Sequence, residues 1–208
     1  EKNRDQINPL ERLACLPESR IFHINADVAA IGMKRFDRLN EIRIPMHSLA
    51  SALHTDFRIP NCSYEIFLRM TRFMTKNEKE VEKAFSYCVF NVCMNNRDDH
   101  TKNFSYLMSQ NGEWALSPAY DLTFNTGMNG HHQMDVEGET YRITRQHLLS
   151  LAKNSGLDLN KSEVLLDHIV GIARNRIDDL FNGQYAISKE TVSLIKTKVE
   201  ENIKLLDS

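Results

Sequence analysis

From residue 48 onward, apolar and polar positions mostly recur with the period of an α-helix. The clearest helix is expected at residues 78–94, where one face collects the apolar side chains of Val81, Ala84, Phe85, Cys88, Val89 and Val92. Further helices are expected at residues 48–54, 64–74, 145–155, 161–182 and 189–206. The expected N-caps are Ser63, Thr144 and Ser188, and the expected C-terminal stops are Gly156 and Gly183.

Strand-like runs precede and interrupt these helices. Residues 20–24 ("RIFHI") and 28–36 ("VAAIGMKRF") show little helical periodicity. Residues 103–116 ("NFSYLMSQNGEWAL") alternate on both sides of Asn111-Gly112, a dipeptide that favours the tight turn of a β-hairpin. The predicted fold class is therefore α+β, mainly helical, with one short β-hairpin.

A polar block, "NNRDDHTKNF" (95–104), lies between the 78–94 helix and this hairpin. A hairpin returns its second strand beside its first, so "SPAYD" (117–121) should end near the residues just before Phe104. The side chains of Asp98, Asn103 and Asp121 would then bring carboxylate and amide oxygens into one place.

Composition narrows the class of protein. The 208 residues are 41% hydrophobic and 26% charged, which is typical of a soluble globular chain of one large or two small domains. A net charge of −2 provides no general basic field, which argues against nucleic acid as a direct ligand. No apolar run approaches the ~20 residues of a membrane helix, and "EKNRDQ" is no signal peptide. Because the four cysteines show no C-x-x-C spacing, we expect reduced thiols and a cytoplasmic protein.

The spacing of the polar side chains indicates a reaction type. Nucleotide-bound Mg²⁺ takes hard oxygen ligands, and phosphoryl transfer to a hydroxyl needs a nearby carboxylate and positive charge for the phosphate. Protein kinases supply an Asp, an Asn five residues later, and a metal-binding Asp beyond a short hairpin. Asp98, Asn103 and Asp121 have this spacing, and Lys102 adds an ammonium group.

The pair "NNRDDHTKNFSYL" and "LSPAYDL" resembles the catalytic segment of HipA-type serine/threonine kinases, the toxins of HipA–HipB toxin–antitoxin systems. "MKRFDR" (33–38) is similar to the hinge of that family, and "SYEIFLRM" to its following helix. "GETYRITRQHLLSLAKNSGL" is similar to its segment beyond the metal-binding Asp. The resemblance runs, with gaps, from about residue 21 to the last helices.

The resemblance implies a role for each catalytic-loop residue. Asp98 would be the catalytic base, and Asn103 and Asp121 would bind Mg²⁺. His100 and Tyr120 would line the nucleotide site. Lys102 would face phosphate. Purely structural interpretations of these three residues stay open. In these, His100 bonds a carbonyl group, Tyr120 packs in the core and Lys102 is solvated.

The resemblance also places the adenine of ATP at the hinge. The backbone around Lys34 and Phe36 would bond its edge, and Asp37 would lie near the ribose. The family usually has Glu at the position of Lys34, a change that main-chain recognition tolerates. Asp99 is left out of the catalytic set, and His131-His132 is given no role.

A complete kinase also needs a phosphate-binding Lys and a covering loop in an N-terminal lobe, and neither is found in this sequence. Residues 1–45 are therefore interpreted as a remnant of that lobe and the hinge. Residues 46–208 form the helical C-terminal lobe, with catalytic loop 95–104 and metal-binding segment 117–122. The missing lobe lies upstream in the same chain or is a separate polypeptide.

The leading hypothesis is Mg-ATP-dependent phosphorylation of a Ser or Thr hydroxyl on a protein. The resemblance implies an aminoacyl-tRNA synthetase as a target and a HipB-like DNA-binding antitoxin as a partner. One alternative is a kinase-like binding module that is inactive without the N-terminal lobe, and another is a small-molecule phosphotransferase. A metal-dependent hydrolase built on Asp98, Asp99, His100 and Asp121 fits less well, because an amide ligand such as Asn103 suits nucleotide-bound Mg²⁺.

Overall fold

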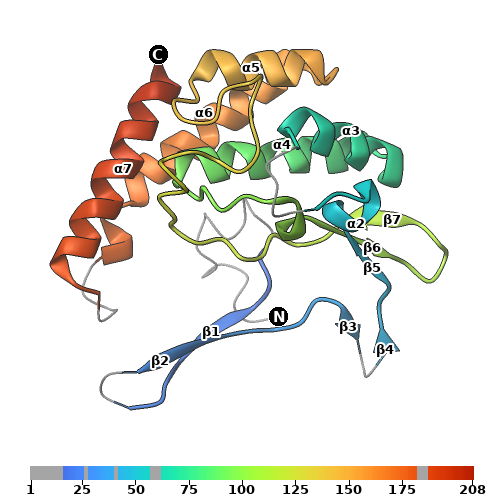
Figure 1. Cartoon of the computed structure of the whole chain (residues 1–208), viewed down its shortest axis with the longest axis horizontal. Helices are drawn as coiled ribbons and strands as arrows, with labels where there is room; N and C mark the ends of the chain where they lie inside the picture. Colours follow the sequence, from blue (N-terminus) through green and yellow to red (C-terminus); the bar gives the residue numbers. More distant parts are fainter. Residues whose placement is uncertain (1–15, 26–27, 40–41, 57–61, 182–186) are drawn as a thin grey trace.

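The computed structural model describes residues 16–25, 28–39, 42–56, 62–181 and 187–208. Helices dominate after residue 48 and form one packed body (Figure 1). They are α2 (Leu49–Leu53), α3 (Tyr64–Thr75), α4 (Glu78–Cys93), α5 (Arg145–Asn154), α6 (Leu159–Arg176) and α7 (Lys189–Asp207), with 3₁₀ turns η2 (Thr101–Asn103) and η3 (Asp179–Phe181). All six expected helices are present.

The helix boundaries follow local capping chemistry. The hydroxyls of Ser63 and Ser188 accept the N–H groups of Ile66 and Thr191, as expected of N-caps. The helix predicted at 161–182 instead begins at Leu159, because Asp158 accepts the N–H of Lys161. It ends at Arg176, so its predicted end was wrong, and the proposed stop at Gly183 lies outside the described residues.

Helix α4 lies at the centre of the core and contacts α3, α6 and α7. The predicted apolar face is confirmed, since all six of its side chains are buried. Cys88 and Cys93 are buried free thiols, as predicted, and burial raises the pKa of Cys93 to about 12. Within the described ranges, no helix is long and apolar enough to span a bilayer.

The predicted hairpin is part of a three-stranded antiparallel sheet. Strands β6 (Ser105–Met108) and β7 (Trp114–Leu116) pair across a turn in which Gly112 has a φ of 80°. A further strand, β5 (Met46–Ser48), pairs with β6 on its other edge. The sequence did not reveal β5, because three residues are too few to show an alternating pattern.

The two strand-like runs near the N-terminus form the antiparallel hairpin β1 (Ser19–His23) and β2 (Ala29–Met33). Strands β3 (Arg38–Leu39) and β4 (Ile42–Arg43) follow, and Figure 1 shows both pairs standing away from the helical body. The β1–β2 region exposes the large apolar side chains of Ile21, Phe22, Ile24, Val28, Ile31 and Met33. A lone two-stranded hairpin is marginally stable in water, and an exposed apolar surface of this kind is typical of a site where another segment or protein packs.

Candidate functional site

The polar block begins where α4 ends. Asn95 has a φ of 58°, a left-handed conformation that Asn adopts more readily than most residues, and this reverses the chain. Its Nδ2 donates to the carbonyl of Asn125 at 3.1 Å, and the N–H of Asn125 donates to the carbonyl of Asn95 at 3.0 Å. The start of the candidate catalytic loop is therefore fixed to a segment thirty residues later.

The far end of the loop is fixed to the same segment. The N–H of Ser117 donates to the carbonyl of Ser105 at 2.8 Å, and the hydroxyl of Tyr120 donates to the carbonyl of Lys102 at 2.5 Å. Because the proton of the Tyr120 hydroxyl is used, Ser105 Oγ donates to it across 2.6 Å. Residues 117–125 thus lie along residues 95–105, as the predicted hairpin geometry requires. The exposed Asp121 is held between these two anchor points.

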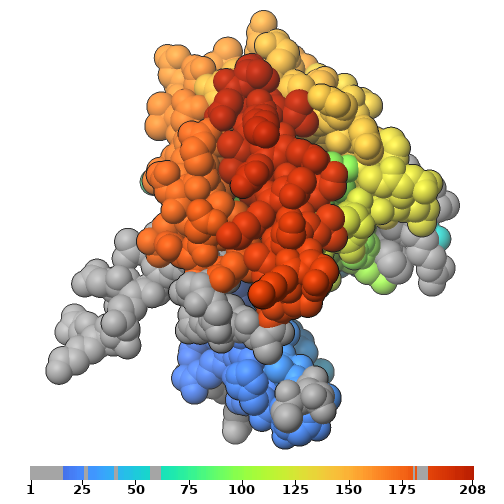
Figure 2. Space-filling view, turned by 90° about the vertical axis from the view of Figure 1, so that its left-hand side faces the viewer, coloured from blue at the N-terminus to red at the C-terminus, as the bar shows by residue number. Residues whose placement is uncertain are grey.

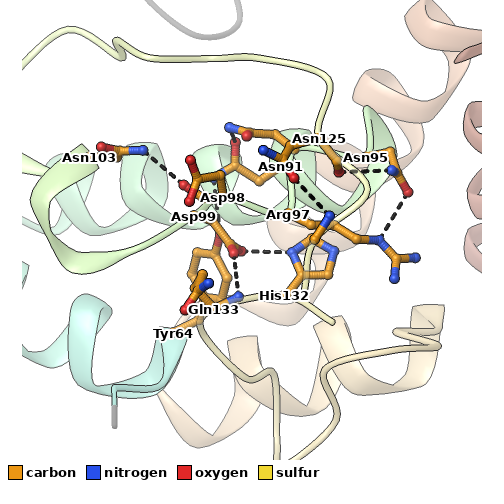
Figure 3. Close-up of polar contacts among 12 residues, drawn as sticks. Tyr64, Asn91, Asn95, Arg97, Asp98, Asp99, Asn103, Asn125, His132 and Gln133 are labelled. Carbon is orange, nitrogen blue, oxygen red and sulfur yellow. Dashed lines mark hydrogen bonds and ion pairs between the residues drawn. The ribbon is translucent and has the colours of Figure 1, made fainter. Parts of the chain in front are cut away.

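Asn103 and Asp98 are joined directly (Figure 3). Asn103 Nδ2 donates to the backbone carbonyl of Asp98 at 2.9 Å, which leaves the amide oxygen as the group that could meet a cation. Both side chains are half-buried. A small hollow is lined by Asn103 together with Ala119, Tyr120 and Leu122, the residues on either side of Asp121. The structure therefore brings the loop and the 117–122 segment to one place.

Asp99 is the most buried member of the polar block, and its contacts are structural (Figure 3). Its Oδ2 accepts the hydroxyl of Tyr64 at 2.7 Å and lies 2.8 Å from His132 Nδ1, which must carry the proton because a carboxylate accepts. Its Oδ1 accepts the N–H of Gln133 at 2.8 Å. With both oxygens engaged, Asp99 holds the loop in place. This disfavours the hydrolase alternative, which used Asp99 as a metal ligand.

The Asp99 network extends into the core. Asn91 Nδ2 donates to the oxygen of Tyr64 at 3.0 Å, and Asn96 Nδ2 donates to Asn91 Oδ1 at 3.0 Å. Burial and the charge of Asp99 raise the pKa of Tyr64 well above its usual value, so the hydroxyl remains a donor. The sequence did not reveal the roles of Asp99 and His132, because two single polar residues 33 positions apart form no recognisable motif.

The hinge residues are brought only partly into the site. The ring of Phe36 lies 5.5 Å from that of Tyr120, which connects the hinge with the 117–122 segment. The carboxylate of Asp37 instead accepts bonds from Arg35 and Arg38, and the hydrogen bond from Arg35 lowers its pKa. The N–H of Lys34 donates to the carbonyl of Glu18 at 2.8 Å. The adenine and ribose roles of these residues stay predictions.

His100 and Lys102 lie on the loop as expected, but their predicted ligands are untested. His100 is half-buried immediately before η2, and its carbonyl accepts the N–H of Asn103 at 2.9 Å. Lys102 lies within η2 and is exposed to solvent. Among the described residues, no group of three His, Cys, Asp or Glu side chains is placed to hold a metal ion.

A loop beside the site is held together by the carboxylate of Glu139. Glu139 Oε1 accepts the N–H groups of Thr140, Tyr141 and Arg142, and the backbone bond from Tyr141 contributes most to lowering the pKa of Glu139 below 4.5. A carboxyl group whose folded-state pKa is depressed stabilises the protein above its unfolded pKa, and this contribution disappears as pH falls through the folded value.

We therefore expect Glu139→Gln to lower stability at about pH 6 and to have a smaller effect at about pH 3. Urea denaturation at both pH values measures the difference. The exposed Glu200 on α7 provides the control, because Glu200→Gln should have little effect at either pH. A Glu139→Gln effect that stayed the same at both pH values would contradict the role of these backbone bonds.

Comparison with known proteins identifies similar sequences and structures. The family described as "HipA-like C-terminal domain" matches residues 14–177. HipA from Shewanella oneidensis MR-1, solved in a complex with HipB and its operator DNA, superposes with a TM-score of 0.76 at 18% identity. The match covers 94% of this chain and 52% of that one, so this chain spans about half the length of that HipA. No curated protein sequence gives a significant match. At this identity, the structural likeness establishes the fold.

Proposed function

The chain belongs to the HipA-like C-terminal domain family, and from this premise we propose that it is the C-terminal lobe of a protein kinase. The reaction would transfer the γ-phosphate of Mg-ATP to a Ser or Thr hydroxyl of a protein. The observation that carries the proposal is the pair of anchors between residues 95–105 and 117–125. These anchors hold the loop that carries Asp98 and Asn103 against the segment that carries Asp121, and the carbonyl of Asp98 orients the amide of Asn103.

The donor set fits a magnesium-bound nucleotide. Asn103 uses its nitrogen within the loop, which leaves its oxygen as a hard ligand, and Asp121 supplies an exposed carboxylate. These two residues would hold Mg²⁺, which when bound neutralises negative charge on the phosphates. Lys102 would face the phosphates, and His100, Phe36 and Tyr120 would border the nucleotide.

Asp98 is the proposed base. Its carboxylate makes no hydrogen bond within the described part of the chain, while its backbone carbonyl is held by Asn103. It is therefore placed by the backbone, and its side chain remains available to orient a substrate hydroxyl and accept its proton.

The exposed apolar surface of β1 and β2 supports an N-terminal lobe as a further part of the enzyme. Ile31 in β2 is 73% exposed and Ile24, just after β1, is 65% exposed, and so much exposure is unusual for neighbouring large apolar side chains. The similar HipA chain is about twice as long as this one. A lobe packed on this surface would also supply the phosphate-binding Lys and the covering loop.

We expect the 208-residue chain alone to bind Mg-ATP weakly or not at all, because in the proposed kinase an N-terminal lobe would form one wall of the nucleotide site. The same chain joined to its N-terminal lobe should bind, and Asp121→Asn should weaken that binding by removing a metal ligand. Calorimetric titration of Mg-ATP into the three proteins tests both statements. Micromolar affinity in the isolated chain would overturn the requirement for the lobe.

Similarity to HipA also suggests a partner and a substrate, which we propose for this chain. The similar HipA is found with HipB and operator DNA, so a HipB-like antitoxin is the proposed partner of this chain. An aminoacyl-tRNA synthetase is the proposed substrate. The rival function is transfer to a small molecule, and a kinase assay that compares protein extract with a panel of aminoglycosides separates the two.

A further inference from the structure

A second cavity, of about 470 Å³, opens where the candidate catalytic loop begins. It lies between α7, the loop around Gly127 and Gly130, and Tyr141-Arg142. Figure 2 views the molecule from the side where α7 (red) borders the segment coloured yellow, which includes residues from this loop. None of the candidate catalytic or metal-binding residues lines it.

Arg97 contributes a buried positive charge to this cavity. The residue is only 9% exposed, and its guanidinium group lies 5.5 Å from the centre of the Tyr141 ring. Nε donates to Asn95 Oδ1 at 3.1 Å, and one terminal nitrogen donates to the carbonyl of Tyr141 at 3.3 Å. Both acceptors are neutral, and burial lowers the pKa of Arg97. Within the described chain, no carboxylate forms an ion pair with this guanidinium.

The remaining terminal nitrogen of Arg97, Nη1, makes no hydrogen bond to any described residue. It lies toward Gly130, where an added Cβ would be 3.7 Å away. A buried charge is normally paired and its donors satisfied, because desolvation is costly. Nη1 of Arg97 is therefore a donor with no acceptor among the described residues, and the carboxylates of Asp99 and Glu201 act on the guanidinium only from beyond ion-pair distance.

Most of the other charged side chains around the cavity are also cationic. Arg142, Lys198 and Lys204 join Arg97 in its lining, against the single carboxylate of Glu201. Lys198 pairs with Glu201 at 2.8 Å, whereas Arg142 and Lys204 form no ion pair with any described residue. This surplus of cations is local, since the whole chain has a net charge of −2.

We propose that this cavity binds a phosphate dianion, either as a phosphorylated Ser or Thr residue or as a small free phosphate. Arginine suits such a ligand because its planar N–H groups match two phosphate oxygens. The cations are gathered around one cavity and do not form the extended basic stripe that a nucleic acid backbone requires.

The location gives the bound phosphate a consequence for the proposed kinase. Arg97 directly precedes Asp98, and Asn95 is bonded to Asn125 and, through Asn202 Nδ2 at 3.1 Å, to α7. An anion held by Arg97, Arg142 and Lys204 would link the loop to α7 and restrict its motion. This regulatory effect rests on the proposed function, whereas the binding itself does not.

The binding test contains neither nucleotide nor Mg²⁺, so its result is independent of kinase activity. Inorganic phosphate, a phosphoserine peptide and chloride are titrated at constant ionic strength into the ¹⁵N-labelled chain. We expect saturable shifts of the Gly127, Gly130 and Asn202 resonances with the phosphates and none with chloride. Tighter binding of the peptide would identify a phosphorylated residue as the ligand, and equal binding would identify free phosphate.

Two surface variants test the assignment without disturbing the core. Arg142→Ala and Lys204→Ala should each weaken phosphate binding about fivefold, the effect of losing one exposed charged hydrogen bond. Lys153→Ala, an exposed lysine in the last turn of α5 and outside the cavity lining, should leave it unchanged. Unsaturable shifts, or equal effects of all three variants, would show a non-specific ionic response and overturn the proposal.

Discussion

Asp98→Asn should abolish phosphoryl transfer by the protein that includes the N-terminal lobe, while Mg-ATP binding stays nearly unchanged. An Asn side chain has the same shape as Asp but cannot accept the proton of the substrate hydroxyl. The backbone carbonyl of residue 98 is untouched, so Asn103 keeps its hydrogen bond and its orientation. The loss of a positioned base corresponds to a rate decrease on the order of 10²–10⁴-fold.

The measurement is transfer of labelled phosphate to protein extract, together with calorimetric titration of Mg-ATP. Asp121→Asn is the matched comparison, because it should weaken nucleotide binding itself. The two variants therefore separate the proposed base from the proposed metal ligand. Full turnover by Asp98→Asn would show that the base has been assigned to the wrong residue.

Asp99→Ala should cause the largest loss of stability among substitutions in the polar block, about 3 kcal/mol. The carboxylate is fully buried and accepts from Tyr64, His132 and the backbone of Gln133. Removing it leaves the buried donors of Tyr64 and His132 and the part-buried N–H of Gln133 without their acceptor. A buried polar group left unsatisfied loses the full cost of its desolvation.

Urea denaturation of Asp99→Ala and Asp98→Ala measures this effect with a neighbouring control. Asp98 is half-buried and its side chain makes no hydrogen bond in the described part of the chain, so its removal should cost less than about 1 kcal/mol. The adjacent aspartates should therefore divide the roles: Asp98 affects activity and Asp99 affects folding. Equal denaturation midpoints for the two variants would contradict this division.

Helix positions were largely predictable from the sequence, because local signals determine them. The 78–94 helix was found from its apolar face, and α3 and α7 from Ser63 and Ser188. The end of α6 was not found, since the residues beyond Arg176 continue the apolar pattern into the 3₁₀ turn η3. Periodicity alone cannot separate an α-helix from a short 3₁₀ continuation.

The candidate site was predictable where its residues are close in sequence or connected by a hairpin. Asp98, Asn103 and Asp121 could be grouped because an Asn-Gly turn determines which residues return together. His132 and Arg97 could not be assigned, because their contacts with Asp99 and Tyr141 depend on tertiary packing. A single sequence contains no signal for such long-range pairs.

Strand β5 gives the candidate site a mechanical connection to the region before it. Pro45 accepts the N–H of Met108 at 3.0 Å, and the N–H of Leu49 donates to the carbonyl of Phe104 at 2.8 Å. The chain that leaves the hinge is thus bonded through its backbone to both ends of the strand following Asn103. A displacement of β1–β4 relative to β6 would therefore pull on the end of the catalytic loop at residue 104. The connection consists of backbone hydrogen bonds, so side-chain substitutions in β5 would leave it intact.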